Sequence, residues 1–311
     1  MIVIASANGD VGLPAAWAIL QAGGSALDAV EAATRLVEDN PADHSVGYSG
    51  YPNLIGQVEL DASIMDGATL RAGAVGALRS YRHPISVARR VMEELPHVLL
   101  AGEGAARFAA EIGMAREDLL TLDAAHAWRD GIEGRLPEAY RDAHGAIAAD
   151  LLRRATHLAT DPERVAGTVN VIAQDCAGRI ASAVSTSGWA WKYPGRLGDS
   201  PLIGAGNYAD DRYGAAACTG WGELAIRAGT TRSVVLYLKH GYSLVDACRE
   251  AFRDLAALGM PPDQCLMSMV ALDRHGNHCA VTTAPGRTYV YQAGGMAEPA
   301  LLPRTVVDVT A

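Results

Sequence analysis

Residues 168–186 read TVNVIAQDCAGRIASAVST. Both ends of this stretch are rich in β-branched residues, and Asp175 to Gly178 between them carry a turn pattern. The pattern predicts a β-hairpin, which opens a second strand-rich block of the chain. The sequence before it, from about 123 to 167, is polar and helix-permissive, and we interpret that segment as a partly mobile connector.

Further elements are expected on both sides of the hairpin. Upstream, strand-like stretches predict strands at 1–5 and 59–65. Capping residues and helical periodicity predict helices at 14–21, 25–39, 84–95 and 102–112. Downstream, the same signals predict strands at 214–218, 266–272 and 278–283, and helices at 219–227 and 243–255. Strand-rich blocks that each carry helices predict layered sheets covered by helices, an α+β fold.

The composition restricts the possible partners. The chain has 311 residues, of which 50% are hydrophobic and 20% charged, and a net charge of −9 without a basic stripe. This charge argues against nucleic acids and anionic membranes as partners. The longest apolar stretches are far below the ~20 residues that span a bilayer, and the N-terminus lacks the features of a signal peptide. We therefore expect a cytoplasmic protein with no nucleic-acid or membrane partner.

Common catalytic motifs are absent from the sequence, including a Walker loop, HExxH and GxSxG. His275, His278 and Cys279 could be drawn as metal ligands, but they lie across a predicted hairpin turn with no fourth ligand nearby in sequence. The five cysteines are odd in number and form no CxxC pair, which favours reduced, buried thiols. We predict no metal site and no organic cofactor.

Longer motifs lie between 166 and 223. GTV, STSG, PGRLGDSPLIGAG and ACTGWGE follow one another in this order. They resemble the family of N-terminal-nucleophile (Ntn) hydrolases that contains glycosylasparaginases, plant-type asparaginases and isoaspartyl peptidases. The upstream pieces GGSALDAVEAA, SVGYSGYPN and LDASIMDG resemble the glycosylasparaginase branch in particular. The similarity covers nearly the whole chain and is weakest in the connector and after Thr283.

The resemblance implies a four-layer αββα sandwich and a self-cleavage reaction. In this family the hydroxyl of an internal threonine attacks the preceding carbonyl, and hydrolysis of the resulting ester frees the α-amine of that threonine. The matching bond here is Gly167–Thr168, so cleavage would give an α subunit, 1–167, and a β subunit, 168–311, which together form one folded domain. The resemblance further implies a dimer of processed units, an (αβ)2 assembly.

Two threonines of the predicted hairpin match catalytic positions of the family. Thr168 matches the nucleophile, and its freed amine matches the base that accepts the hydroxyl proton. Thr186 matches the threonine that hydrogen-bonds and orients this nucleophile. The alternative interpretations are structural: Thr168 as a β-branched strand residue, and the two threonines as a cross-strand pair.

Four downstream residues match the substrate site. Arg196 and Asp199 match the pair that binds the α-carboxylate and α-ammonium groups of the substrate. An arginine can bind a carboxylate through two parallel hydrogen bonds, and an aspartate supplies the opposite charge for the ammonium group. A simple surface salt bridge between them is the alternative. Thr219 and Gly220 match the oxyanion hole, and Thr219 is also a candidate N-cap of the following helix.

The chain departs from the family pattern at several positions. Ala166 and Gly167 replace the His-Asp pair of glycosylasparaginases, and Asn170 replaces a glycine. The early tryptophan that lines the pocket of glycosylasparaginases is absent near Ser6 and Ala7, which weakens glycosylated asparagine as the substrate. Trp189 and Trp191 are extra aromatic residues, and we expect them either to stack on the leaving group or to pack in the core.

The sequence thus predicts a self-processing threonine hydrolase that needs no cofactor or metal and cleaves the side-chain amide of aspartyl substrates through an acyl-enzyme. Its substrates would be small molecules or dipeptides: isoaspartyl dipeptides, asparagine or N4-substituted asparagine. One alternative is an unprocessed, non-catalytic member that binds an amino acid through Arg196 and Asp199. A cysteine amidase that uses Cys176 or Cys218 is the weaker alternative.

Overall fold

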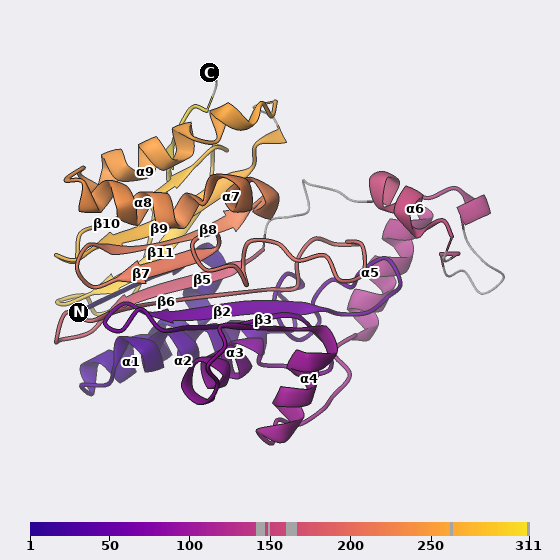
Figure 1. Cartoon of the computed structure of the whole chain (residues 1–311), viewed down its shortest axis with the longest axis horizontal. Helices are drawn as coiled ribbons and strands as arrows, with labels where there is room; N and C mark the ends of the chain where they lie inside the picture. The colour runs from indigo at the N-terminus through magenta and orange to yellow at the C-terminus, as the bar shows by residue number, and fades with distance from the viewer. Residues whose placement is uncertain (141–146, 149, 160–166, 262–263, 310–311) are drawn as a thin grey trace.

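The computed structural model of the chain describes all residues except 141–146, 149, 160–166, 262–263 and 310–311. Within this part the strands form two sheets (Figure 1). The larger sheet has the order β12-β11-β1-β5-β6-β2-β3-β4, and its strands are β1 (Ile2–Ser6), β2 (Leu60–Asp66), β3 (Ala72–Leu78), β4 (Leu99–Ala101), β5 (Val169–Gln174), β6 (Ile180–Thr186), β11 (Thr288–Ala293) and β12 (Ala300–Pro303). The smaller sheet has the order β13-β10-β9-β8-β7, and its strands are β7 (Asn207–Asp210), β8 (Gly214–Gly220), β9 (Met267–Asp273), β10 (His278–Thr282) and β13 (Thr305–Val306).

The predicted hairpin at 168–186 is confirmed as β5 and β6, which pair antiparallel with Val169 opposite Ser185. Every residue of both strands is buried, because the larger sheet is covered on both faces. β5 also pairs with β1, and β6 with β2, so the hairpin lies in the middle of the sheet. Its open end therefore brings Thr168 and Thr186 together between other strands rather than at an exposed edge.

Helices cover the outer face of each sheet (Figure 1). The larger sheet is covered by α1 (Leu13–Gln21), α2 (Ala26–Glu38), α3 (Pro84–Glu94) and α4 (Gly102–Glu111), and the smaller by α8 (Thr230–Lys239) and α9 (Leu244–Arg253). The inner faces of the sheets pack against each other through residues such as Ile4, Val184 and Val270. The order across the molecule is thus helices, sheet, sheet, helices. No helix among the described residues is long and apolar enough to cross a membrane.

Helix α2 illustrates how well local signals predict an element. The hydroxyl of Ser25 accepts a hydrogen bond from the backbone N–H of Asp28 at 3.1 Å, as expected for an N-cap. Val30, Thr34 and Val37 are fully buried along one face of the helix. The helix ends at Glu38, just before Asn40 and Pro41, as predicted.

The strands of the second strand-rich block are divided between the two sheets, because β5, β6, β11 and β12 join strands from the first part of the chain in the larger sheet. One expectation differs from the structure: Thr219 does not cap the following helix. Thr219 still belongs to β8, where it lies opposite Ser268 of β9, and α7 (Gly222–Ala228) begins only after its N-cap residue, Trp221.

The connector contains the elements α5 (Leu122–Glu133), η2 (Glu138–Tyr140) and α6 (Leu152–Ala159), which project from one end of the sheets in Figure 1. Ile132, Leu136 and Ala155 of this projection pack in one apolar cluster with Leu54 and Trp191. The rest of the predicted mobile connector, 141–146, 149 and 160–166, lies outside the described residues. The described part of the connector thus packs in a small apolar core that it shares with residues outside it.

Candidate active site

The hydroxyl groups of Thr168 and Thr186 meet at the end of the central hairpin. Thr168 directly precedes β5 and is 9% exposed, and its Oγ1 donates a hydrogen bond to Thr186 Oγ1 at 3.2 Å. Thr186 Oγ1 also accepts a bond from the N–H of Gly188 at 2.9 Å and donates to the carbonyl of Ser45 at 3.4 Å. These contacts fix the orientation of the Thr186 hydroxyl, and through it that of Thr168.

The residue before Thr168 fits its place only without a side chain. A Cβ atom on Gly167 would lie 1.8 Å from Cβ of Ser45 and 2.0 Å from its Oγ. Ser45 is held in place by Asp43, whose Oδ1 accepts bonds from both the hydroxyl and the backbone N–H of Ser45. The other carboxylate oxygen of Asp43 accepts a bond from Asn8 Nδ2 at 2.8 Å. The Gly167–Thr168 peptide therefore passes through a tight, polar passage.

Asn170, which replaces a glycine of the family pattern, is fully buried behind Thr168. Its Oδ1 accepts a bond from the N–H of Ser6 at 3.0 Å, and its Nδ2 donates to the carbonyl of Ala217 at 3.1 Å. The hydroxyl of Ser6 in turn accepts a bond from the N–H of Asn170 and lies 3.4 Å from the carbonyl oxygen of Thr168. The asparagine side chain thus ties β5 to β1 and, across the two sheets, to β8.

Arg196 and Asp199 line a small cavity together with Thr168, Thr186 and Gly220. They do not form the salt bridge with each other that was the alternative interpretation of this pair. Arg196 instead makes a bidentate ion pair with Glu223, with donor–acceptor distances of 2.9 and 2.7 Å. Its guanidinium group also stacks on Trp189, 4.4 Å from the ring centroid. The sequence motif contains Glu223 but does not predict this contact.

Asp199 is only 4% exposed, and its Oδ2 has no hydrogen-bond partner among the described residues. Burial raises the pKa of this carboxyl from 3.8 to about 7, although the nearby charge of Arg196 opposes the shift. A buried acceptor without a partner is costly. A cationic donor placed against this oxygen would satisfy it.

Thr219 and Gly220 lie at the end of β8, and both line a second, larger cavity that also includes Thr168. Gly220 has a φ of +122°, and a Cβ atom there would lie 2.2 Å from the carbonyl oxygen of Leu266. Glycine is therefore required at this position. Thr168 and Gly220 line both cavities, so the nucleophile candidate lies where the two meet.

The larger cavity has a volume of about 610 Å³, enough for a small organic molecule. Its walls come from η1 (Ala7–Val11), the loop after α2, and the ends of β8, β9, β10 and β11. Its lining includes both acidic residues, Asp10 and Asp43, and basic residues, Arg287 and Arg304. A ligand in this cavity therefore meets charges of both signs.

Known proteins are similar to this sequence over most of its length. Residues 11–298 match the asparaginase family. The chain belongs to this family. It is 38% identical to an N(4)-(β-N-acetylglucosaminyl)-L-asparaginase of Elizabethkingia miricola over 275 residues, which cover 87% of this chain and 75% of that protein. It is also 38% identical to a plant-type L-asparaginase of Pyrococcus furiosus (89% and 86% covered) and 39% identical to an isoaspartyl peptidase of Salmonella typhimurium (90% and 83% covered). The resemblance inferred from the motifs at 166–223 is confirmed.

A buried ionic cluster supports the site of this asparaginase-family protein, and sequence reasoning missed it. Lys192 is 1% exposed, its Nζ donates to the carbonyl of Glu59 at 3.1 Å, and Asp61 Oδ2 lies 3.8 Å away. Burial lowers the pKa of Lys192 and raises that of Asp61, whereas their mutual attraction opposes both shifts. Asp61 pairs with Thr186 across the strands, and Lys192 lies under Gly188. The only sequence signal is a lysine in an apolar stretch.

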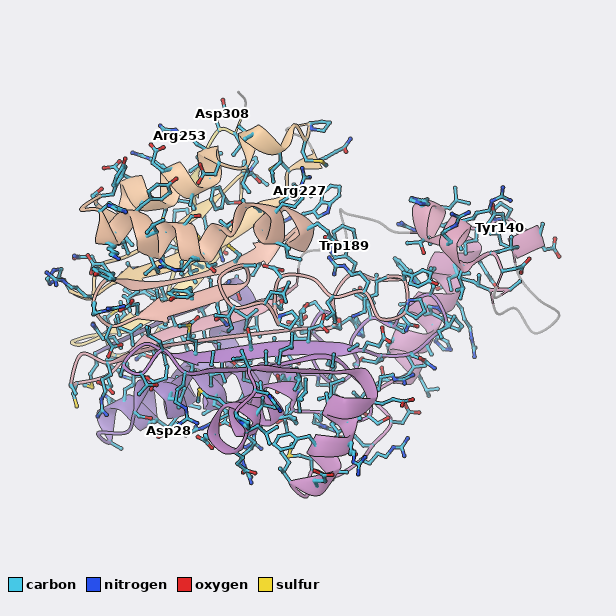
Figure 2. The ribbon with its side chains drawn as sticks, in the orientation of Figure 1. Asp28, Tyr140, Trp189, Arg227, Arg253 and Asp308 are labelled. Atoms are coloured by element: carbon cyan, nitrogen blue, oxygen red, sulfur yellow. The ribbon has the colours of Figure 1, made fainter. Side chains whose placement is uncertain are left out.

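The two additional tryptophans have different environments in this asparaginase-family protein. Trp191 is fully buried in the cluster shared with α5 and α6, so it packs in the core. Trp189 is half-buried, contacts Trp221 edge-to-face at 5.3 Å, and lines the small cavity rather than the large one. Figure 2 shows Trp189 at the end of the sheets from which α5 and α6 project. Neither tryptophan lines the large cavity.

The cysteines are poorly placed for nucleophilic chemistry. Cys218 is fully buried, and burial raises the pKa of its thiol well above the ordinary value, so the reactive thiolate is disfavoured. Cys176 is exposed in the turn between β5 and β6, at the opposite end of the hairpin from Thr168. Neither thiol lines the cavities around Thr168. This geometry disfavours the cysteine amidase.

Proposed function

We propose that this protein is a self-processing threonine amidohydrolase that cleaves the side-chain amide of aspartyl substrates through an acyl-enzyme. The observation that carries the proposal is the hydrogen bond between the hydroxyls of Thr168 and Thr186 at the junction of two cavities, one of them lined by Arg196 and Asp199. Membership of the asparaginase family supports it. The succession of helices, sheet, sheet and helices supports the four-layer αββα sandwich of Ntn hydrolases.

The proposed first reaction cuts the chain. The hydroxyl oxygen of Thr168 attacks the carbonyl carbon of Gly167, the peptide C–N bond breaks, and the Thr168 nitrogen takes a proton to become a free α-amine. Water then hydrolyses the ester, which leaves a carboxylate on Gly167 and restores the hydroxyl. The close fit of Gly167 against Ser45 supports a fixed position of this peptide for the step. The products are the subunits 1–167 and 168–311.

The second reaction uses the new amine. With an ordinary pKa of about 7.7–8.0, it can accept the hydroxyl proton of Thr168 near neutral pH. The hydroxyl oxygen then attacks the β-carboxamide carbon, the leaving amine takes a proton, and water hydrolyses the aspartyl ester to release aspartate. Thr219 and the N–H of Gly220 are the proposed donors to the oxyanion, a contribution of about 3 kcal/mol per donor in similar sites.

The proposed substrate orientation follows from the charges. Arg196 would bind the α-carboxylate through the guanidinium edge that Glu223 leaves open, and Asp199 would bind the α-ammonium group. The scissile amide then reaches Thr168, and the leaving group enters the larger cavity. We further propose that processed units pair into (αβ)2 and that the enzyme is cytoplasmic.

Intact-mass measurement tests the proposal. Purified wild-type protein should convert from one species of 32.6 kDa into two fragments, and the smaller fragment should begin with Thr-Val-Asn. Thr168→Ala should remain whole, and it should not release aspartate from β-aspartyl dipeptides, asparagine or glycosylated asparagine. A wild-type protein that stays whole and inactive but binds L-aspartate would instead support the amino-acid-binding alternative.

A further inference from the structure

Arg304 lies at the point where the chain crosses from the larger sheet to the smaller one, between β12 and β13. It is 7% exposed and lines the same large cavity as Thr168. Its Nε donates to the carbonyl of Thr288, and its Nη1 donates to the carbonyl of Met269, both at 2.9 Å. Carbonyl groups from two different strands thus fix the guanidinium group at the cavity wall.

The charge of Arg304 is not compensated by an acid. No carboxylate forms an ion pair with it in the described part of the chain, and its Nη2 has no hydrogen-bond partner there. The charged or polar groups that affect it are Cys218, Tyr289 and Arg287, none of which is a carboxylate. Burial lowers the pKa of Arg304 to about 10, which still leaves the group protonated at neutral pH. By contrast, Arg82, Arg89 and Arg196 each pair with an acid.

A buried cation without a counter-ion is costly unless a ligand supplies the missing charge. A second arginine of the same cavity, Arg287, is exposed, and its carbonyl oxygen accepts a hydrogen bond from the backbone N–H of Arg304 at 2.9 Å. Asp10 and Asp43 also line the cavity, and their carboxylates repel an anion. An anionic group would therefore lie against Arg304.

We infer that Arg304, assisted by Arg287, forms a subsite that binds a carboxylate carried by the leaving group of the substrate. This inference rests on the proposed function, in which the leaving group occupies the larger cavity. A β-aspartyl dipeptide meets the requirement, because its leaving amine is an amino acid that carries an α-carboxylate. The leaving groups of asparagine and of glycosylated asparagine, ammonia and a glycosylamine, carry none. Arg304 is thus a specificity-determining residue that favours dipeptides with a free C-terminus.

Binding to an uncleavable variant tests the subsite independently of catalysis. In Thr168→Ala, calorimetry compares β-aspartylglycine with β-aspartylglycinamide, which differ only in the terminal charge. We expect the free acid to bind about 10- to 100-fold more tightly, the range of a hydrogen bond between charged groups. In Thr168→Ala/Arg304→Gln the two affinities should differ by less than about 3-fold. Arg227→Gln, which removes the same charge from an exposed position on α7, should leave the preference intact.

Turnover by the processed enzyme gives the second measurement. Arg304→Gln should lower kcat/KM for the free acid about 10- to 100-fold and change kcat/KM for the amide and for asparagine by less than about 3-fold. Equal binding of acid and amide to Thr168→Ala, or no binding of either, would overturn the subsite. An equal loss for all three substrates would also overturn it, because it would indicate a merely structural arginine. Failure of the proposed function is distinct, since it appears as a wild type that neither cleaves itself nor turns over asparagine.

Discussion

The affinity of this protein for L-aspartate should depend on pH through Asp199, in a way that succinate does not share. Burial raises the pKa of Asp199 to about 7. Below that pH the carboxyl is protonated and neutral, and above it the carboxylate attracts an ammonium group. L-Aspartate carries the α-ammonium group and succinate lacks it, while the carbon skeleton and the two carboxylates are the same. The ratio of their Kd values therefore isolates the interaction with Asp199.

The magnitude follows from the pKa. A pKa of about 7 leaves about 1% of the carboxyl ionised at pH 5 and about 90% at pH 8. The Kd of L-aspartate, divided by that of succinate, should therefore rise about 100-fold from pH 8 to pH 5. Other titrating groups of the protein, including the freed amine of Thr168, meet both ligands and cancel in the ratio, and the variant Asp199→Asn measures the titration of the ligands' own carboxyls. Isothermal calorimetry on the processed enzyme at four pH values measures this ratio of Kd values.

The variant Asp199→Asn is the control, because its side chain has no charge to titrate. Its ratio of Kd values should reflect only the titration of the two ligands and change by less than about 10-fold between pH 5 and 8. A wild-type ratio that changes no more than that of the variant, or an Asp199→Asn ratio that retains the wild-type pH dependence, would refute this role of Asp199. The first result would mean that the ammonium group lies elsewhere, and the second that another acid near the ligand titrates.

The same raised pKa affects the free energy of unfolding of the unliganded protein. The folded state binds the Asp199 proton more tightly than the unfolded chain, in which the pKa is near 3.8. This stabilisation is fully present below about pH 3.8 and is lost as the pH rises through about 7. The shift corresponds to about 4 kcal/mol. Asp199→Asn should accordingly be more stable than wild type in urea at pH 8, and close to it at pH 4.

Three further changes have expected outcomes. Gly167→Ala should slow self-cleavage, followed by gel electrophoresis over time, because a Cβ there would lie 1.8 Å from Cβ of Ser45. Thr186→Val should lower kcat about 100-fold, because it removes the hydroxyl that accepts the bond from Thr168 and a misplacement of about 1 Å has that cost. Trp191→Ala should lower the free energy of unfolding by about 3–5 kcal/mol, measured in urea, because the ring is fully buried.

Matched controls separate these effects from general damage. Gly104→Ala lies on α4 with no atom within 4 Å of the added Cβ, and should leave self-cleavage at the wild-type rate. Thr186→Ser keeps the hydroxyl and should recover most of kcat. Trp191→Phe keeps most of the apolar volume and should lower the free energy of unfolding by less than Trp191→Ala does. Wild-type cleavage by Gly167→Ala, or equal rates for the two variants of Thr186, would contradict the geometry described above.

Local signals predicted the elements whose stability is local. β5 and β6 have β-branched residues around a turn, and α2 has its Ser25 cap and one apolar face. β3 escapes such reasoning because its sequence, AGAVGAL, has little strand propensity. Its glycines serve a distant contact instead, since a Cβ on Gly73 would lie 2.0 Å from the carbonyl oxygen of Ala88 on α3. The sequence pattern does not predict helix α8 either. Its sequence, TTRSVVLYLK, is rich in β-branched residues, and tertiary packing decides its conformation.

Some residues of the site are predicted by the sequence motif, and others are placed only by long-range contacts. The motif pointed to Thr168, Thr186 and Asp199, and the fold brings them around one small cavity. Glu223 and Arg304 have partners that lie 27 and 35 residues away in sequence, so no local pattern reveals them. Asn170 looked like a loss of a family glycine, yet its side chain joins three strands. Long-range polar contacts of this kind depend on the register of the whole sheet.

The order of strands in the larger sheet has a consequence for any attempt to make the two halves of the protein separately. β1 from 1–167 is inserted between β11 and β5 from 168–311, and β6 from 168–311 pairs with β2 from 1–167. Each half expressed alone would expose long unsatisfied strand edges, which are prone to aggregate. The two polypeptides should therefore be inseparable without denaturation, and the order of events in the cell is fixed: the chain folds whole, and only then can it be divided.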